Sequence, residues 1–102
     1  MKTINRTGMM PDEKAALYGI QTLSDAELLA LILRSGTKGT DVVSIAEEVL
    51  RSVGGNIGGI TAVTEDRLHS LKGIGRVKSS QIAAIAELSR RIWNSRRDLR
   101  IH

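Results

Sequence analysis

The chain is poor in residues on which several common classes of protein depend. Its 102 residues include no cysteine, no phenylalanine, one tryptophan, one tyrosine and one proline. The absence of cysteine excludes a disulfide framework and any cysteine-ligated zinc or iron–sulfur site. With so few aromatic side chains, stacking on nucleobases is not expected to be the main mode of binding to a partner.

Long apolar runs are also missing. No stretch has the length of a membrane span, and none resembles the apolar region of a signal peptide, so we expect a soluble, cytoplasmic chain without a membrane partner. The apolar residues are mostly Ile, Leu, Val and Ala, which suit a modest helical core. A chain of 102 residues is the size of one small domain.

Positive charge is concentrated near the C-terminus. The net charge is +4. Residues 1–71 hold seven Lys or Arg and nine Asp or Glu, a balance of −2, whereas residues 72–102 hold eight against two, a balance of +6. This excess favours a polyanionic partner. An anionic membrane is the competing polyanion, but the last helix has no apolar face free for insertion if the core uses that face.

A helix, a tight turn and a second helix are expected in the last third of the chain. Thr64 is a suitable N-cap for the first helix. Gly73 and Gly75 bracket Ile74, so the glycines can adopt backbone angles closed to other residues while the isoleucine fills the core between the helices. The second helix begins near Arg76, and its first N–H groups, which have no acceptor within the helix, can bind an anion.

Three cations lie close to this turn. Lys72 precedes it, while Arg76 and Lys78 fall in the first turn of the second helix, where the helix dipole disfavours a cation unless an anion binds there. The alternative is a plain helix–helix turn with solvated cations. Flanking helices, an apolar plug and three nearby cations together favour phosphate binding. A dinucleotide-binding fingerprint is excluded, because the preceding strand and the third glycine are absent.

The first part of the chain contains two clear helix starts. Residues 1–10 have no periodic pattern and are expected to be flexible. Pro11 is typical of the first position of a helix. Ser24 and Glu27 have the spacing of a capping box at the start of an almost entirely apolar helix, residues 25–33. Capping accounts for the acids here, so we do not assign them a catalytic role.

Four further segments complete the chain. A helix is expected from about residue 41 to 53, a last helix at 77–93, and a basic tail or linker at 94–102. Residues 57–63 are expected to form a single helical turn, and the alternative, suggested by the Gly-Gly pairs, is a β-hairpin. The last helix should bury a stripe made of Ile82, Ile85, Ala86, Leu88 and Ile92.

The loop at residues 34–41 suggests an internal repeat. It contains two glycines and a lysine between two helices, as the later turn does, but it is longer and lacks the apolar plug. If the loop is a degenerate second copy, Arg34 and Lys38 would contact the opposite strand of a duplex. The alternative is two unrelated helix pairs, which a small all-α domain easily contains.

The Gly-Ile-Gly segment resembles the helix-hairpin-helix motif, which in repair and recombination proteins binds the DNA backbone. In that family the hairpin carbonyls sometimes hold a monovalent cation, and we expect no other cofactor and no metal site. Several blocks over residues 11–92 also resemble the N-terminal domain of the bacterial RadC-type proteins. The matching stretches are Pro11 with 13–14, 23–30, 33–37, 72–75 with Lys78, and 87–91.

This resemblance implies a compact all-α bundle of about five helices, built as a helix-hairpin-helix pair over residues 11–93. Asp12 replaces the arginine usual in the family, and Arg76 replaces a common proline, which can strengthen anion binding. RadC-like proteins continue into a metalloprotease-like domain of the JAB/MPN type with a His-x-His motif. That motif is absent here, so the resemblance implies no hydrolase activity for this chain.

The sequence therefore predicts a non-catalytic domain that binds the DNA backbone, duplex or branched, without sequence preference, in DNA repair or recombination. The predicted DNA-binding residues are Arg34, Lys38, Lys72, Gly73, Ile74, Gly75, Arg76, Val77, Lys78 and Ser79. The alternative is a protein-interaction or regulatory module that docks a partner or the metalloprotease-like domain. An exposed apolar patch at residues 57–63 or at Trp93 would favour that alternative.

Overall fold

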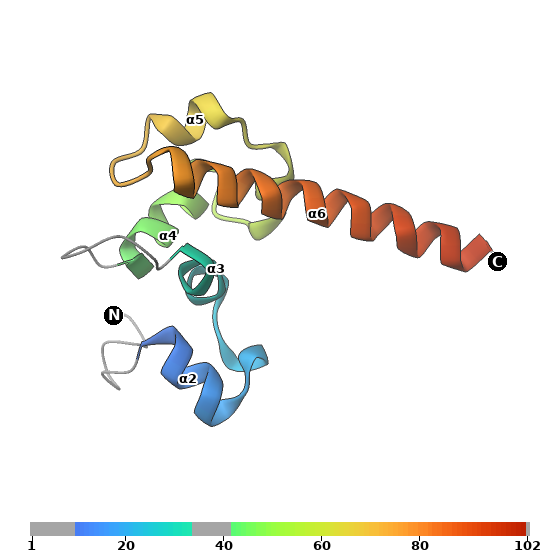
Figure 1. Ribbon diagram of the computed structural model, residues 1–102, viewed down its shortest axis with the longest axis horizontal. Coiled ribbons are helices and arrows are strands. Elements are labelled where there is room, and N and C mark those ends of the chain that lie inside the picture. Colours follow the sequence, from blue (N-terminus) through green and yellow to red (C-terminus); the bar gives the residue numbers. More distant parts are fainter. Residues whose placement is uncertain (1–9, 34–41, 102) are drawn as a thin grey trace. The chain divides into compact units, whose positions relative to one another are not determined.

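The computed structural model describes residues 10–33 and 42–101, with side chains as far as residue 96. These residues form five α-helices and two 3₁₀ helices, with no strand among them (Figure 1). The predicted all-α class is therefore confirmed. The chain divides into two units, residues 1–47 and 48–102, which are taken in turn below.

Unit 1 contains the two helix starts that the sequence predicts. Helix α2 (Pro11–Tyr18) begins at the proline, which has no N–H to leave without an acceptor. The short 3₁₀ helix η1 (Ile20–Thr22) and helix α3 (Asp25–Leu33) follow, and both pack against α2.

A complete capping box closes the start of α3. The backbone N–H of Glu27 donates to Ser24 Oγ at 3.2 Å, and the N–H of Ser24 donates to Glu27 Oε1 at 2.8 Å. The predicted box is confirmed, and a further contact adds to it. Lys14 of α2 lies with its Nζ 3.1 Å from Glu27 Oε1, so the same carboxylate joins α2 to α3.

The Glu27 carboxylate is held in its charged form although it is buried. Only 3% of the residue is exposed. Burial raises the pKa of Glu27, but the hydrogen bond from the Ser24 backbone, together with the hydrogen bond and charge of Lys14, outweighs burial. The resulting pKa lies below the usual value for a glutamate.

Helix α4 (Val42–Ser52) crosses from unit 1 into unit 2 and ends in a Schellman motif. The N–H of Gly55 donates to Leu50 O at 2.8 Å, and the N–H of Gly54 donates to Arg51 O at 3.2 Å. The 3₁₀ helix η2 (Ile57–Ala62) follows, where a single helical turn was expected.

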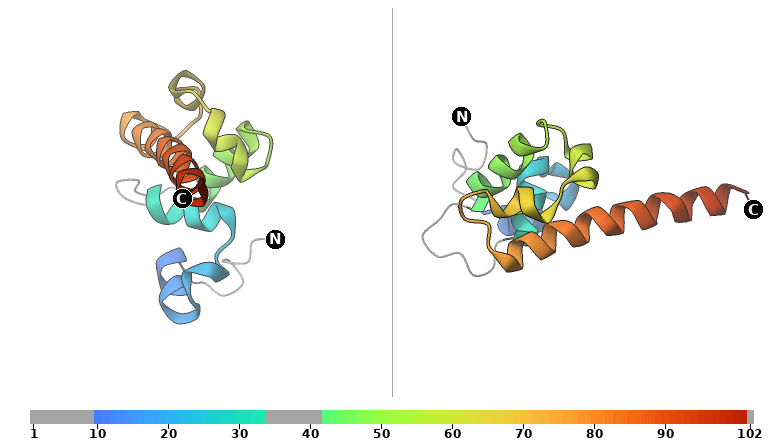
Figure 2. Two further views of the ribbon diagram at one scale, coloured as in Figure 1. Left: turned by 90° about the vertical axis from the view of Figure 1, so that its right-hand side faces the viewer. Right: turned by 90° about the horizontal axis from the view of Figure 1, so that it is seen from above.

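Helices α5 (Glu65–His69) and α6 (Arg76–Ile101) complete unit 2. Figures 1 and 2 show α5 and η2 beside the first half of α6, while the second half of α6 extends past them. The predicted end of the last helix at Trp93 is wrong. Residues 94–101 contain no glycine or proline, so no residue there breaks the helix.

The buried stripe predicted along α6 is only partly correct. Ile82 and Ala86 are buried, with 0% and 3% exposed, but Leu88 and Ile92 are 58% and 59% exposed. The reason is that η2 and α5 cover one side of the first half of α6 only. Toward the C-terminus, the side chain of Arg90 still reaches η2, donating to the carbonyl of Thr61.

Candidate nucleic-acid interface

The candidate interface is the turn between α5 and α6. Thr64 caps α5, accepting from the N–H of Arg67 at 3.2 Å, as predicted. The helix then tightens, because Ser70 donates to Arg67 O at 3.2 Å and Leu71 donates to Leu68 O at 3.0 Å. This tight exit sends the chain directly back into α6.

Ile74 anchors the turn in the core. It is 6% exposed, and Leu68 and Ile82 in the helices on either side are both 0% exposed. The predicted apolar plug is therefore confirmed. Gly73 has a φ of 86°, in the left-handed region where other residues are strained.

Gly75 does not have the backbone conformation expected for it. Its φ is not positive, and a Cβ added there would meet no atom within 4 Å. The unusual backbone angle that the sequence allows at both glycines is therefore adopted by Gly73 and not by Gly75. Gly75 therefore has room for a Cβ, whereas a side chain at Gly73 would be strained.

Several N–H groups at the turn point to no protein acceptor. Ile74 donates to Leu71 O at 3.2 Å, and Ser79 donates to Gly75 O at 3.0 Å. By contrast, no acceptor among the described residues takes a hydrogen bond from the backbone N–H groups of Gly73, Gly75, Arg76 and Val77. The turn and the start of α6 therefore present several free donors, interrupted by the bonded N–H of Ile74.

The predicted cations do not all lie at the surface. Lys72 and Arg76 are exposed beside the turn, and Val77 is 66% exposed. Lys78 and Ser79 are buried, with 7% and 1% exposed. The structure thus leaves Lys72 and Arg76 exposed beside the free N–H groups, whereas Lys78 is buried as a residue.

The predicted second copy of the motif has its loop at residues 34–41. Arg34 and Lys38 lie in the segment 34–41, outside the described residues.

Other arginines of unit 2 are tied to the fold. Arg67 donates from Nη2 to the carbonyl of Ser52 at 3.0 Å, which satisfies a carbonyl at the end of α4. Arg90 and Arg91 both pair with Glu87, at 2.8 and 3.0 Å. The hydrogen bond from Arg90, followed by that from Arg91, lowers the pKa of Glu87. These side chains form a structural set distinct from Lys72 and Arg76.

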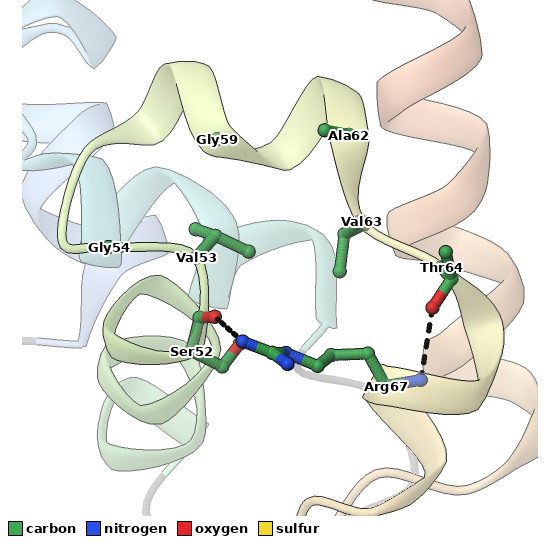
Figure 3. A pocket seen from close by; sticks show the side chains of 8 residues that line it. All are labelled: Ser52, Val53, Gly54, Gly59, Ala62, Val63, Thr64 and Arg67. Carbon is green, nitrogen blue, oxygen red and sulfur yellow. Dashed lines mark hydrogen bonds between the residues drawn. The ribbon is translucent and has the colours of Figure 1, made fainter.

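A pocket of about 420 Å³ lies around Arg67 (Figure 3). The residues that line it come from the end of α4, from η2 and from the start of α5: Ser52, Val53, Gly54, Gly59, Ala62, Val63, Thr64 and Arg67. Its single charged group is the guanidinium that caps α4. In the part of the chain that the structure describes, no cluster of His, Asp or Glu could hold a metal ion.

The comparison with protein families decides which family this chain comes from. The model of the UPF0758 N-terminal family matches residues 5–80, which is most of the chain. The chain belongs to the UPF0758 N-terminal family. This family is the N-terminal region of RadC-type proteins, so the resemblance found in the sequence is confirmed. No solved structure matches the chain.

The family match ends within α6, at residue 80. The UPF0758 N-terminal segment includes the whole α5–α6 turn and its cations, whereas α6 beyond residue 80 lies outside the match. None of the described helices combines the length and apolar character needed to cross a membrane.

Proposed function

We propose that the α5–α6 turn binds the phosphate backbone of DNA without reading its sequence. The observation that carries this proposal is the set of unpaired N–H groups at Gly73, Gly75, Arg76 and Val77. A phosphate oxygen is the acceptor that such a set of donors at a helix start favours.

The cations at the turn support an external anion. Arg76 lies in the first turn of α6, where a positive charge opposes the helix dipole. A bound phosphate reverses this penalty, and Lys72 adds a second exposed charge beside it. Lys72 and Arg76 are the exposed cations of the turn, whereas Lys78 is buried, so the test below uses Lys72 and Arg76.

The expected selectivity follows from the type of contact. Phosphate contacts orient a protein on DNA but carry no sequence information. The domain is accordingly proposed as a non-catalytic, cytoplasmic DNA-binding module acting in DNA repair or recombination, as its RadC-type family suggests. Its affinity should depend strongly on salt and weakly on DNA sequence.

The test is a fluorescence-anisotropy titration with duplex and branched DNA over a series of salt concentrations. The double variant Lys72→Ala with Arg76→Ala removes both exposed cations at the turn. Each lost phosphate contact should reduce the slope of log K against log salt by about 0.9, so we expect a reduction of about 1.8.

A matched control is the double variant Arg51→Ala with Arg91→Ala. This control also removes two positive charges, but from exposed side chains that pair with Glu48 and Glu87. We expect this control to retain most of the wild-type slope. Equal losses in the two double variants, absence of binding at low salt, or a strong preference for one sequence would each overturn the proposal.

A second candidate function is favoured by a separate observation. Trp93 is 56% exposed and Ile57 is 42% exposed, and exposure at these places was the feature expected of a protein-interaction module. In this candidate function the domain docks a protein partner, such as the metalloprotease-like domain of RadC-type proteins.

A further inference from the structure

The second half of α6 has an apolar face that stays exposed. Leu88 and Ile92 are 58% and 59% exposed, and Ile85 beside them is half-buried. The spacings of three and then four residues place these side chains on one side of the helix. This is the spacing of a seam along which two helices pack. We call Ile85, Leu88 and Ile92 the α6 seam.

The α6 seam is distinct from the side of the helix that faces the core. Ile82 and Ala86 are buried and belong to the side covered by α5 and η2. At 100° per residue, Leu88 and Ile92 lie about a third of a turn or more away from Ala86. Figure 2 shows this half of α6 extending past the other elements of unit 2.

Positive charges border the α6 seam on both sides. Arg91 directly precedes Ile92, and its side chain is 76% exposed although it pairs with Glu87. Arg96 follows Ile92 by four residues and lies on the other border, with its guanidinium carbon 5.9 Å from the centre of the Trp93 ring. In paired helices, these bordering positions face the bordering positions of the partner helix.

The charges argue against a second copy of this chain as the occupant. In a parallel pair of α6 helices, Arg91 of one copy would face Arg96 of the other. In an antiparallel pair, each arginine would face its own counterpart. Both arrangements place like charges opposite each other, which disfavours self-pairing.

We propose that the α6 seam docks an amphipathic helix of a protein partner that carries Leu or Ile along its seam and Glu or Asp at its borders. The apolar residues supply the buried area, and the acids pair with Arg91 and Arg96. The ion pair of Arg91 with Glu87 is exposed, so exchanging it for a partner carboxylate costs little. This inference gives the second candidate function a surface and a partner chemistry, and it does not depend on DNA binding.

The test uses two labelled synthetic helical peptides with the same Leu and Ile seam. One peptide has Glu at its border positions and the other has Lys. In anisotropy titrations with the 102-residue chain, the Glu peptide should bind at least about tenfold more tightly than the Lys peptide. The variant Arg91→Glu with Arg96→Glu should reverse this preference.

A second pair of variants tests the apolar contact. Leu88→Ser with Ile92→Ser should weaken binding of the Glu peptide at least about tenfold. The control Leu17→Ser alters an exposed apolar residue of α2, outside both proposed sites, and should leave peptide binding unchanged. Circular dichroism checks that each variant remains helical.

Three results would overturn the proposal. They are equal binding of the two peptides, unchanged binding after the Leu88 and Ile92 substitutions, and dimerisation of the free chain in sedimentation experiments that these substitutions abolish. Because the seam variants leave Lys72 and Arg76 in place, they should bind DNA as the wild type does. Loss of peptide binding can therefore be distinguished from a failure of the DNA proposal.

Discussion

Helices α3 and α6 begin in opposite ways. At the start of α3, Ser24 and Glu27 supply side-chain oxygens to the backbone donors. At the start of α6, Gly75 has no side chain to offer, and Arg76 adds another donor in place of an acceptor. One helix start is closed by the chain itself, and the other remains open to an anion from outside.

The difference separates a structural helix start from a candidate binding site. The Glu27 carboxylate is buried, so its contacts contribute to the stability of unit 1. Gly73, Gly75 and Arg76 are exposed, so water can accept hydrogen bonds from their N–H groups. The closed start of α3 therefore stabilises the fold, whereas the open start of α6 is where we propose that a phosphate binds.

The largest expected effect is on the closed start. Glu27→Ala removes the capping acceptor and leaves the ammonium group of Lys14, which is 14% exposed at its side chain, without its carboxylate. We expect the free energy of unfolding to fall by about 2 to 4 kcal/mol. Urea denaturation measures the change. Ser24→Ala, which removes only one capping bond, should cost about 1 kcal/mol, and equal losses from the two variants would contradict this account.

The Glu27 carboxylate should also make the free energy of unfolding depend on pH in the acidic range. The pKa of Glu27 is lower in the folded chain than in the unfolded chain, so its contribution is fully present above the unfolded pKa of about 4.3. It is lost as the pH falls through the folded pKa. Denaturation midpoints from pH 7 to pH 3 should therefore fall less steeply in Glu27→Gln than in the wild type. Identical profiles would show that Glu27 does not titrate in this way.

The open start can be examined through its two glycines. Gly73→Ala places a Cβ at a φ of 86° and should destabilise unit 2 by about 1 to 2 kcal/mol. Gly75→Ala adds a methyl group where no atom lies within 4 Å, so the free energy of unfolding should change by no more than about 0.5 kcal/mol. Thermal denaturation compares the two variants, and similar losses would mean that Gly75 also constrains the turn.

Local contacts explain which features the sequence could predict. The Ser24–Glu27 box and the Thr64 cap each join residues three apart, so residue type and spacing are enough to identify them. The Ile74 plug follows from an apolar residue placed between two helices. These features depend on neighbours in the chain and not on the tertiary fold.

Tertiary contacts explain what the sequence could not predict. Lys14 meets Glu27 from 13 residues away, and Arg67 meets Ser52 from 15 residues away. No local pattern marks these partners. Burial of Lys78 was missed for the same reason, because its charge suggested a surface residue next to Arg76.

The smallest expected change in stability comes from a variant that closes the open start of α6. Gly75→Asp gives α6 an acceptor of its own and so converts the open start into a closed one. No atom lies within 4 Å of a Cβ at this position, and capping should stabilise unit 2 by about 0.3 kcal/mol. DNA affinity should nevertheless fall at least about tenfold, because the carboxylate occupies the free donors and repels phosphate. The variant Gly75→Asn can also occupy the free donors, but it adds no charge. In the same anisotropy titration it should therefore lose less DNA affinity than Gly75→Asp. If Gly75→Asp stabilised the chain while binding DNA as the wild type does, the open start of α6 would not be the phosphate site.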